Sequence, residues 1–234
     1  MIDLVGVIAH ADDNMVLAQR LGELISNAPE LELDIALGNI ALDHLGVARA
    51  LYTHAGDLEG EGRTEDDLAM FRSEREFTNL LLVEQPNGDF AHIIVRQMLF
   101  DAYQLQLWES LSATEDLVVA GIAAKALKEA RYHFRFSSGW VIRLGAGTEE
   151  SHRRSQDALD ALWQFTGEMF DGDTARLRPK WDRMISDVVE SATLTVPTDP
   201  YQRSGGRQGV HTEHLGFVLA EMQSMARSYP GATW

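Results

Sequence analysis

The stretch ALKEARYH, residues 126–133, lies in the middle of a long run with helical periodicity. Side chains three or four positions apart on a helix share one face, so Glu129 and His133 project from the same side. A Glu-x-x-His pair, in which the two ligands are three positions apart, is the arrangement by which helical bundles bind two metal ions. Here the spacing is four, and Tyr132 occupies the histidine position.

Helical periodicity continues along most of the chain, and the alternation typical of strands is almost absent. The pattern predicts an all-α protein with a single domain over residues 1–234. Asp12 and Asp13 look like caps of the first helix, and Thr64 looks like a cap of the third. The expected helices are 12–26, 32–54, 64–82, 89–111, 115–144, 148–170, 174–193 and 210–228, and residues 197–209 are expected to form a loop.

The composition excludes several classes of function. The chain has 234 residues and a net charge of −16, which disfavours binding to nucleic acid or to anionic membranes. It has no cysteine, so a metal would need carboxylate and imidazole ligands. No apolar run approaches the ~20 residues of a membrane span. Residues 1–4 lack the features of a secretory signal, and we expect a cytoplasmic protein.

Three of the expected helices carry ionisable residues within apolar stripes. Asp43 interrupts one stripe, Asp101 lies in a helix that is apolar almost all round, and Glu129 and His133 share a third stripe. A buried, unpaired carboxylate costs several kcal/mol, so such groups need partners. The partner could be a pair of metal ions or a basic side chain. Lys125, one turn before Glu129, is a candidate for the second role.

The metal alternative lacks most of its usual ligands. A di-iron bundle supplies two Glu-x-x-His pairs and two further glutamates. Gly46 stands at the histidine position after Asp43, as Tyr132 does after Glu129. The true pair Glu149–His152 follows a glycine loop at a helix start, where acidic residues favour the helix dipole. We therefore predict no catalytic, cofactor or metal residues, but a degenerate polar cluster at Asp43, Asp101, Glu129 and His133.

Two further motifs have a structural and a functional interpretation. The pair His211–His214 precedes an apolar helix, and it could bind metal or form a polar helix start. Arg203 and Arg207 flank Gly205-Gly206, and this segment could hold an anion such as a CoA phosphate or form an exposed loop. In both cases the structural role is the expected one.

Several blocks of the sequence resemble one known family over nearly the whole chain. The blocks are IALGNIALD (35–43), NLLLVEQPNGDFA (79–91), FDAY (100–103), KALKE (125–129), RYH (131–133), GTEESHRR (147–154), HTEHLG (211–216) and YPGATW (229–234). They are similar to the C subunits of bacterial ring-1,2-phenylacetyl-CoA epoxidases, the multicomponent oxygenases of aerobic phenylacetate degradation.

This resemblance implies a ferritin-like helical bundle with extra helices. It also implies a division of labour in which a homologous A subunit holds the di-iron centre and binds the CoA ester. The C subunit is its structural, non-catalytic partner, and a B subunit and a flavin/Fe–S reductase complete the system. The degenerate motifs at Asp43 and Glu129 agree with that role. Self-association of the isolated chain stays open.

Three hypotheses follow from these observations. The first is a structural subunit that stabilises a homologous catalytic subunit. The second is a di-metal carboxylate oxygenase that is active in its own right through Asp43, Asp101, Glu129 and His133. The third is a storage or ligand-binding bundle that is unrelated to any oxygenase and assembles without a partner.

Overall fold

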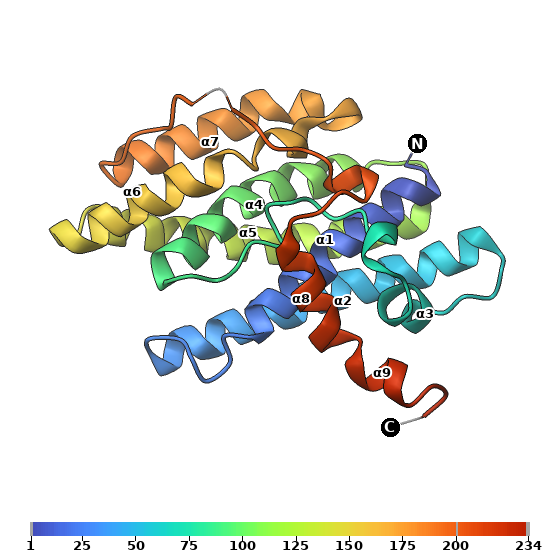
Figure 1. Cartoon of the computed structure of the whole chain (residues 1–234). Coiled ribbons are helices and arrows are strands. Elements are labelled where there is room, and N and C mark those ends of the chain that lie inside the picture. The colour runs from blue at the N-terminus through green and yellow to red at the C-terminus, as the bar shows by residue number, and fades with distance from the viewer. Residues whose placement is uncertain (1, 200, 233–234) are drawn as a thin grey trace. The chain divides into compact units, whose positions relative to one another are not determined.

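A computed structural model describes residues 2–199 and 201–232 of the chain (Figure 1). Every regular element in these residues is helical. The elements are α1 (Leu4–Gly22), α2 (Leu31–Glu59), α3 (Glu65–Met70), η1 (Glu74–Glu76), α4 (Phe90–Leu111), α5 (Leu117–Gly145), α6 (Glu149–Trp163), η2 (Gly167–Phe170), η3 (Gly172–Leu177), α7 (Arg178–Ser191), η4 (Gly206–Gln208), α8 (Glu213–Met222) and α9 (Ser224–Ser228). The all-α prediction is confirmed.

The chain forms two compact units. Unit 1 comprises Met1–Pro86, Thr114–Ile122 and Gly205–Trp234, and unit 2 comprises Asn87–Ala113 and Ala123–Ser204. The expectation of a single domain over residues 1–234 stays a prediction. Residue 200 of the expected loop and residues 233–234 of the last resemblance block lie outside the described residues. None of the described helices is long and apolar enough to cross a membrane.

In unit 1, α1 and α2 form a helical hairpin and pack along each other (Figure 1). Fully buried leucines and branched residues of both helices, among them Val16, Leu17, Ile40 and Leu51, form its apolar core. Each such side chain contributes about 1.5–3 kcal/mol when it leaves water. The hairpin therefore supplies a rigid frame for the polar groups that it also buries.

The first helix begins well before the predicted position. Asp3 caps α1 by accepting a hydrogen bond from the Gly6 amide at 2.8 Å. Asp12 and Asp13, which were expected to cap the helix, lie in its interior with 0% exposure. The prediction was wrong because an aspartate before an apolar run looks like a cap, whereas these two bind arginines far away in the sequence.

The predicted helix 64–82 ends at Met70. Thr64 and Asp67 form a capping box at its start, as expected. Among the described residues between Phe71 and Asp89, the only regular element is the short η1, although Phe77 and Leu80 are fully buried. Buried backbone groups outside a helix need other partners. In this segment, carboxylates of α1 supply acceptors for the amides of residues 78 and 80.

In unit 2, α4 is buried almost all round and packs against α6 and α7. The Trp181 indole of α7 donates a hydrogen bond to the Leu99 carbonyl of α4 at 2.9 Å. Phe170 packs edge-on against both Tyr103 and Trp181. These contacts hold α4 as the central helix of the unit, as its apolar pattern predicted.

Most other helix ends lie within a few residues of their predicted positions. The helix expected at 148–170 is an exception, because α6 ends at Trp163 and short 3-10 turns follow. The helix expected at 32–54 continues to Glu59, and the helix expected at 210–228 is divided into α8 and α9. Pro179 lies in the first turn of α7, where its missing amide hydrogen costs little. The expected loop 197–209 contains the short η4, and its Arg203 amide binds the Gln164 carbonyl at 2.7 Å.

Candidate functional site

Unit 2 holds a buried carboxyl on α4. Asp101 is 1% exposed. The Ser137 hydroxyl donates a hydrogen bond to it at 2.7 Å, and the Gln97 amide donates another at 3.2 Å. Burial raises the pKa of Asp101 well above its ordinary value, and the Ser137 hydrogen bond offsets this only in part. Because both partners are neutral, the site favours the protonated carboxylic acid.

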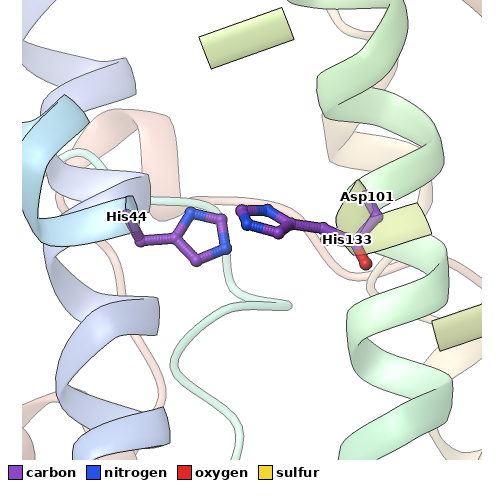
Figure 2. Close-up of side chains that lie close together, drawn as sticks. All are labelled: His44, Asp101 and His133. Atoms are coloured by element: carbon purple, nitrogen blue, oxygen red, sulfur yellow. The ribbon is translucent and has the colours of Figure 1, made fainter. Parts of the chain in front are cut away.

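His133 on α5 lies beside this carboxyl. Its side chain is buried, and one ring nitrogen lies within 4.8 Å of an Asp101 carboxylate oxygen. Figure 2 shows Asp101 and His133 as sticks on α4 and α5, and it also draws His44 of α2. An imidazole and a carboxyl so close together can share a proton, or they can supply two ligands to a metal ion.

Glu129 and Lys125 form an ion pair at the edge of unit 2. Lys125 Nζ lies 3.5 Å from Glu129 Oε1, and the two side chains are 72% and 19% exposed. The expected partner is therefore present, but it reaches Glu129 from solvent. Tyr132 is 42% exposed, and its ring stacks on Phe136. The position three residues after Glu129 thus faces outward.

In unit 1, the sequence predicted that Asp43 of α2 is buried, but the buried residue is its neighbour His44. Asp43 is half-buried, whereas His44 is 2% exposed. The Nδ1 atom of His44 lies 2.8 Å from the Asn14 side-chain oxygen, and the Asn14 amide donates to the His10 carbonyl at 2.8 Å. The sequence pattern predicted Asp43 in place of His44. Adjacent residues of a helix point in directions about 100° apart, so only one of the two can face the core.

Unit 1 also buries three acids that the sequence pattern did not place. The first is Asp12, which forms an ion pair with the buried Arg72. The Tyr52 hydroxyl donates to Asp12 at 2.5 Å, and the Thr78 amide does so at 2.8 Å. The Arg72 guanidinium also stacks 4.2 Å above the Phe77 ring. Asp12 thus ties α1 to the non-helical segment after α3.

The second buried acid, Asp13, binds an arginine of the C-terminal segment. Arg207 donates to both carboxylate oxygens, at 3.0 and 2.7 Å, and also to the Thr78 carbonyl at 2.7 Å. Burial would raise the pKa of Asp13, but the Arg207 charge and the hydrogen bonds from His10 and Arg207 together outweigh burial and lower it. Arg207 therefore has a structural partner. The loop is exposed at residues 201–204, as the sequence predicted, but Gly206 and Gly209 are buried.

The third buried acid is Glu84, which binds the start of α8. It accepts hydrogen bonds from the Thr212 amide at 2.6 Å and from the Thr212 hydroxyl at 2.7 Å. His211 Nδ1 lies 2.8 Å from Glu84, and its Nε2 lies 2.9 Å from the Phe77 carbonyl. Burial opposes a charge on His211, but these two hydrogen bonds raise its pKa above the ordinary value.

His211 uses both ring nitrogens inside the protein, so the structural interpretation of His211–His214 is the one that the geometry supports. The Glu149–His152 pair is structural as well. Thr148 caps α6 through the Ser151 amide, and His152 Nδ1 lies 2.7 Å from the Gly145 carbonyl.

One signal in the sequence could have revealed the buried acids of α1. Apolar residues lie on both sides of Asp12 and Asp13, as in a helix interior.

Two positions at which a di-iron centre carries its histidines hold other residues in this chain. Such a centre uses four carboxylates and two histidines, with each histidine three positions after a carboxylate. In this chain Gly46 and an outward-facing Tyr132 stand at those positions. The acids of unit 1 are bound by arginines and a histidine, and Asp101 is bound by neutral groups. Protein side chains therefore bind these four buried acids, Asp12, Asp13, Glu84 and Asp101.

These features define an all-helical protein that buries acids and histidines on several of its described helices. A family model described as "Phenylacetic acid catabolic protein" matches residues 4–234, and the chain belongs to this family. Among curated proteins, the C subunit of 1,2-phenylacetyl-CoA epoxidase from Escherichia coli (strain K12) is 49% identical over 237 residues, which cover 95% of each chain. The resemblance found in the sequence blocks is confirmed.

Proposed function

We propose that this chain is a non-catalytic structural subunit of an oxygenase complex that epoxidises phenylacetyl-CoA in aerobic phenylacetate catabolism. It stabilises a homologous catalytic A subunit, which holds the di-iron centre and binds the CoA ester. A B subunit and a reductase complete the complex, which works in the cytoplasm. The name of the 49% identical relative supports this assignment, because that relative is one of the subunits of a phenylacetyl-CoA epoxidase.

The observation that carries the proposal is the state of the two motif positions. Tyr132 follows Glu129 where a di-iron protein has its histidine, and its ring lies half in solvent. Gly46 follows Asp43 in the same way and has no side chain at all. A bundle without these two histidines lacks two of the ligands that coordinate a di-iron centre. It still has the helices against which a homologous partner can pack.

The test is co-expression of this chain with the homologous A subunit, with a tag on one partner. We expect the two to co-purify, and we expect the A subunit to be soluble and active with reductase only when this chain is present. Oxygen-dependent turnover of phenylacetyl-CoA by this chain and reductase alone would overturn the proposal. Failure of the two chains to bind each other would overturn it as well.

A second candidate is a di-metal oxygenase that is active in its own right. The buried Asp101–His133 pair favours it, because these groups offer two ligand atoms within 4.8 Å of each other. Glu129→Ala separates the two candidates. A metalloenzyme that uses Glu129 loses its chemistry, whereas a structural subunit keeps the turnover of the assembled complex and changes only in stability or partner affinity. The loss of the Lys125 ion pair alone is a small perturbation, since that lysine is largely in solvent.

A further inference from the structure

One face of the unit 1 hairpin exposes a row of large apolar side chains. Leu31, Ile35, Leu42 and Leu45 of α2 are 69%, 57%, 64% and 37% exposed, and Ile25 before α2 is 58% exposed. The four residues of α2 recur at helical spacing and so share one face. Single exposed leucines are normal on a protein surface, but a continuous row of them marks a surface that another molecule covers.

The row borders a groove between α1 and α2 with a volume of about 450 Å³. Its lining includes Ile25, Ile35 and Leu42, together with Gly22 and Gly38. The groove lies wholly within unit 1. It therefore combines apolar walls with positions that have no side chain, which is the shape that receives an apolar ridge of another helix.

The glycines of this face have no role inside the chain. A Cβ atom added at Gly22 or Gly38 would meet nothing within 4 Å. Glycine in a helix is less stable than alanine, and here no internal contact requires it. Gly56 of the same helix is different, because a Cβ there would lie 2.3 Å from the Arg63 carbonyl oxygen. Gly38, which lines the groove, therefore leaves room for another backbone to approach.

The charges around the groove indicate the chemistry of what covers it. Residues 21–48 contain no lysine or arginine. The acids of this stretch are Glu23, Glu30, Glu32, Asp34 and Asp43. Of these, Asp34 lines the groove itself, and Glu23 forms an ion pair with Arg20 at the end of α1. Two copies of the chain that met through this face would bring two acidic rims together, and the whole chain already carries a net charge of −16. A different chain with basic residues beside an apolar ridge fits the surface.

We infer that the groove of α1 and α2 is the docking surface for the homologous catalytic subunit, which inserts an apolar helical ridge flanked by lysine or arginine. This inference rests on the proposed function, since it names the surface through which that partner is held. The apolar row supplies the buried centre of the interface, Gly38 allows close approach of the two backbones, and the acidic rim orients the partner and speeds its association.

The experiment measures the affinity of the catalytic subunit for the intact chain and for three variants. Gly38→Leu fills the groove, Leu42→Arg places a positive charge in the apolar row, and Glu32→Lys reverses one charge of the rim. Gly139→Leu is the matched control, because Gly139 of α5 is also half-buried and a Cβ there also meets nothing within 4 Å. Circular dichroism melting of each isolated variant checks that it folds.

We expect Gly38→Leu and Leu42→Arg to weaken binding about 30-fold or more, as for residues at the centre of an interface. Glu32→Lys should weaken binding less, and it should reduce the dependence of the affinity on salt. Gly139→Leu should bind like the unchanged chain. Affinities unchanged in both Gly38→Leu and Leu42→Arg would overturn the docking surface while the proposed function stands.

Two other outcomes separate the remaining possibilities. If the unchanged chain does not bind the catalytic subunit at all, the proposed function itself fails. If light scattering shows that the isolated chain is a dimer and that Gly38→Leu makes it monomeric, a second copy covers the groove and the inferred occupant is wrong. A monomer in both cases, with loss of catalytic-subunit binding in Gly38→Leu, supports the inference.

Discussion

Removal of the Arg72 charge should strongly destabilise unit 1. Asp12 is 0% exposed and accepts five hydrogen bonds, two of them from Arg72 and the others from Tyr52 and Thr78. Arg72→Met keeps much of the length of the side chain but leaves the buried carboxylate without a cation. Loss of one partner of a buried pair costs about 3–5 kcal/mol. The Tyr52 hydroxyl and the Thr78 amide and hydroxyl still donate to Asp12 in this variant. We therefore expect the free energy of unfolding to fall by about 3 kcal/mol, the lower end of this range.

A double-mutant cycle isolates the pair from its surroundings. Asp12→Asn alone should cost a similar amount, because it leaves the Arg72 guanidinium buried beside a neutral amide. The loss of unfolding free energy in the double variant should be about 2 kcal/mol smaller than the sum of the losses in the two single variants, as for groups in one polar network. The measurement is urea unfolding followed by far-UV circular dichroism at pH 7.

An exposed pair provides the control for this cycle. Glu150 and Arg153 lie 2.9 Å apart, and both side chains are more than half exposed. Glu150→Gln and Arg153→Met should leave the unfolding midpoint unchanged within error. A loss below about 1 kcal/mol for Arg72→Met, or strictly additive effects at Asp12 and Arg72, would show that this buried charge pair does not organise unit 1.

Three further predictions concern stability. Because burial raises the pKa of Asp101, folding should become less favourable as the pH rises from the ordinary carboxyl range toward that raised value, and urea unfolding of Asp101→Asn should lack this decline. Because the pKa of His211 is also raised, its hydrogen bond to Glu84 should stabilise most below about pH 6.5 and lose its effect as the pH rises through the raised pKa; His211→Gln should cost about 1–3 kcal/mol at pH 6 and less at pH 9. Gly56→Ala places a Cβ 2.3 Å from a backbone oxygen and should lower the free energy of unfolding by about 1–3 kcal/mol, whereas Gly46→Ala, which meets nothing within 4 Å, should raise it by about 0.5–1 kcal/mol.

The long helices were predictable because their own residues specify them. The apolar pattern and the Asp89 cap set α4 at Phe90–Leu111, close to the predicted 89–111. The glycines after residue 144 set the end of α5 in the same way. Such signals act over three or four residues and are visible in a single sequence.

The buried acids of unit 1 were not predictable in this way. Asp12 binds Arg72, which is 60 residues further along the chain, and Asp13 binds Arg207, which is 194 residues away. The sequence shows only two adjacent aspartates before an apolar run, a pattern that is also typical of a helix cap. Tertiary pairing, which local reasoning cannot see, decided between the two interpretations.

The candidate site was predictable in part. The apolar environment of α4 correctly indicated that Asp101 is buried, and the stripe of α5 indicated the same for His133. On α2 the choice fell on Asp43, whereas His44 is the buried residue. The side chains of adjacent helix residues point in directions about 100° apart. A small error in the predicted direction of the core therefore selects the wrong residue.

We propose that this chain serves a metal centre that lies in the homologous catalytic subunit. The most direct measurement is the iron content of each subunit, separated after anaerobic reconstitution of the complex with Fe(II). We expect about two irons on the homologous catalytic subunit and none on this chain. About two irons bound to this chain, and released in Asp101→Asn and His133→Ala, would contradict it.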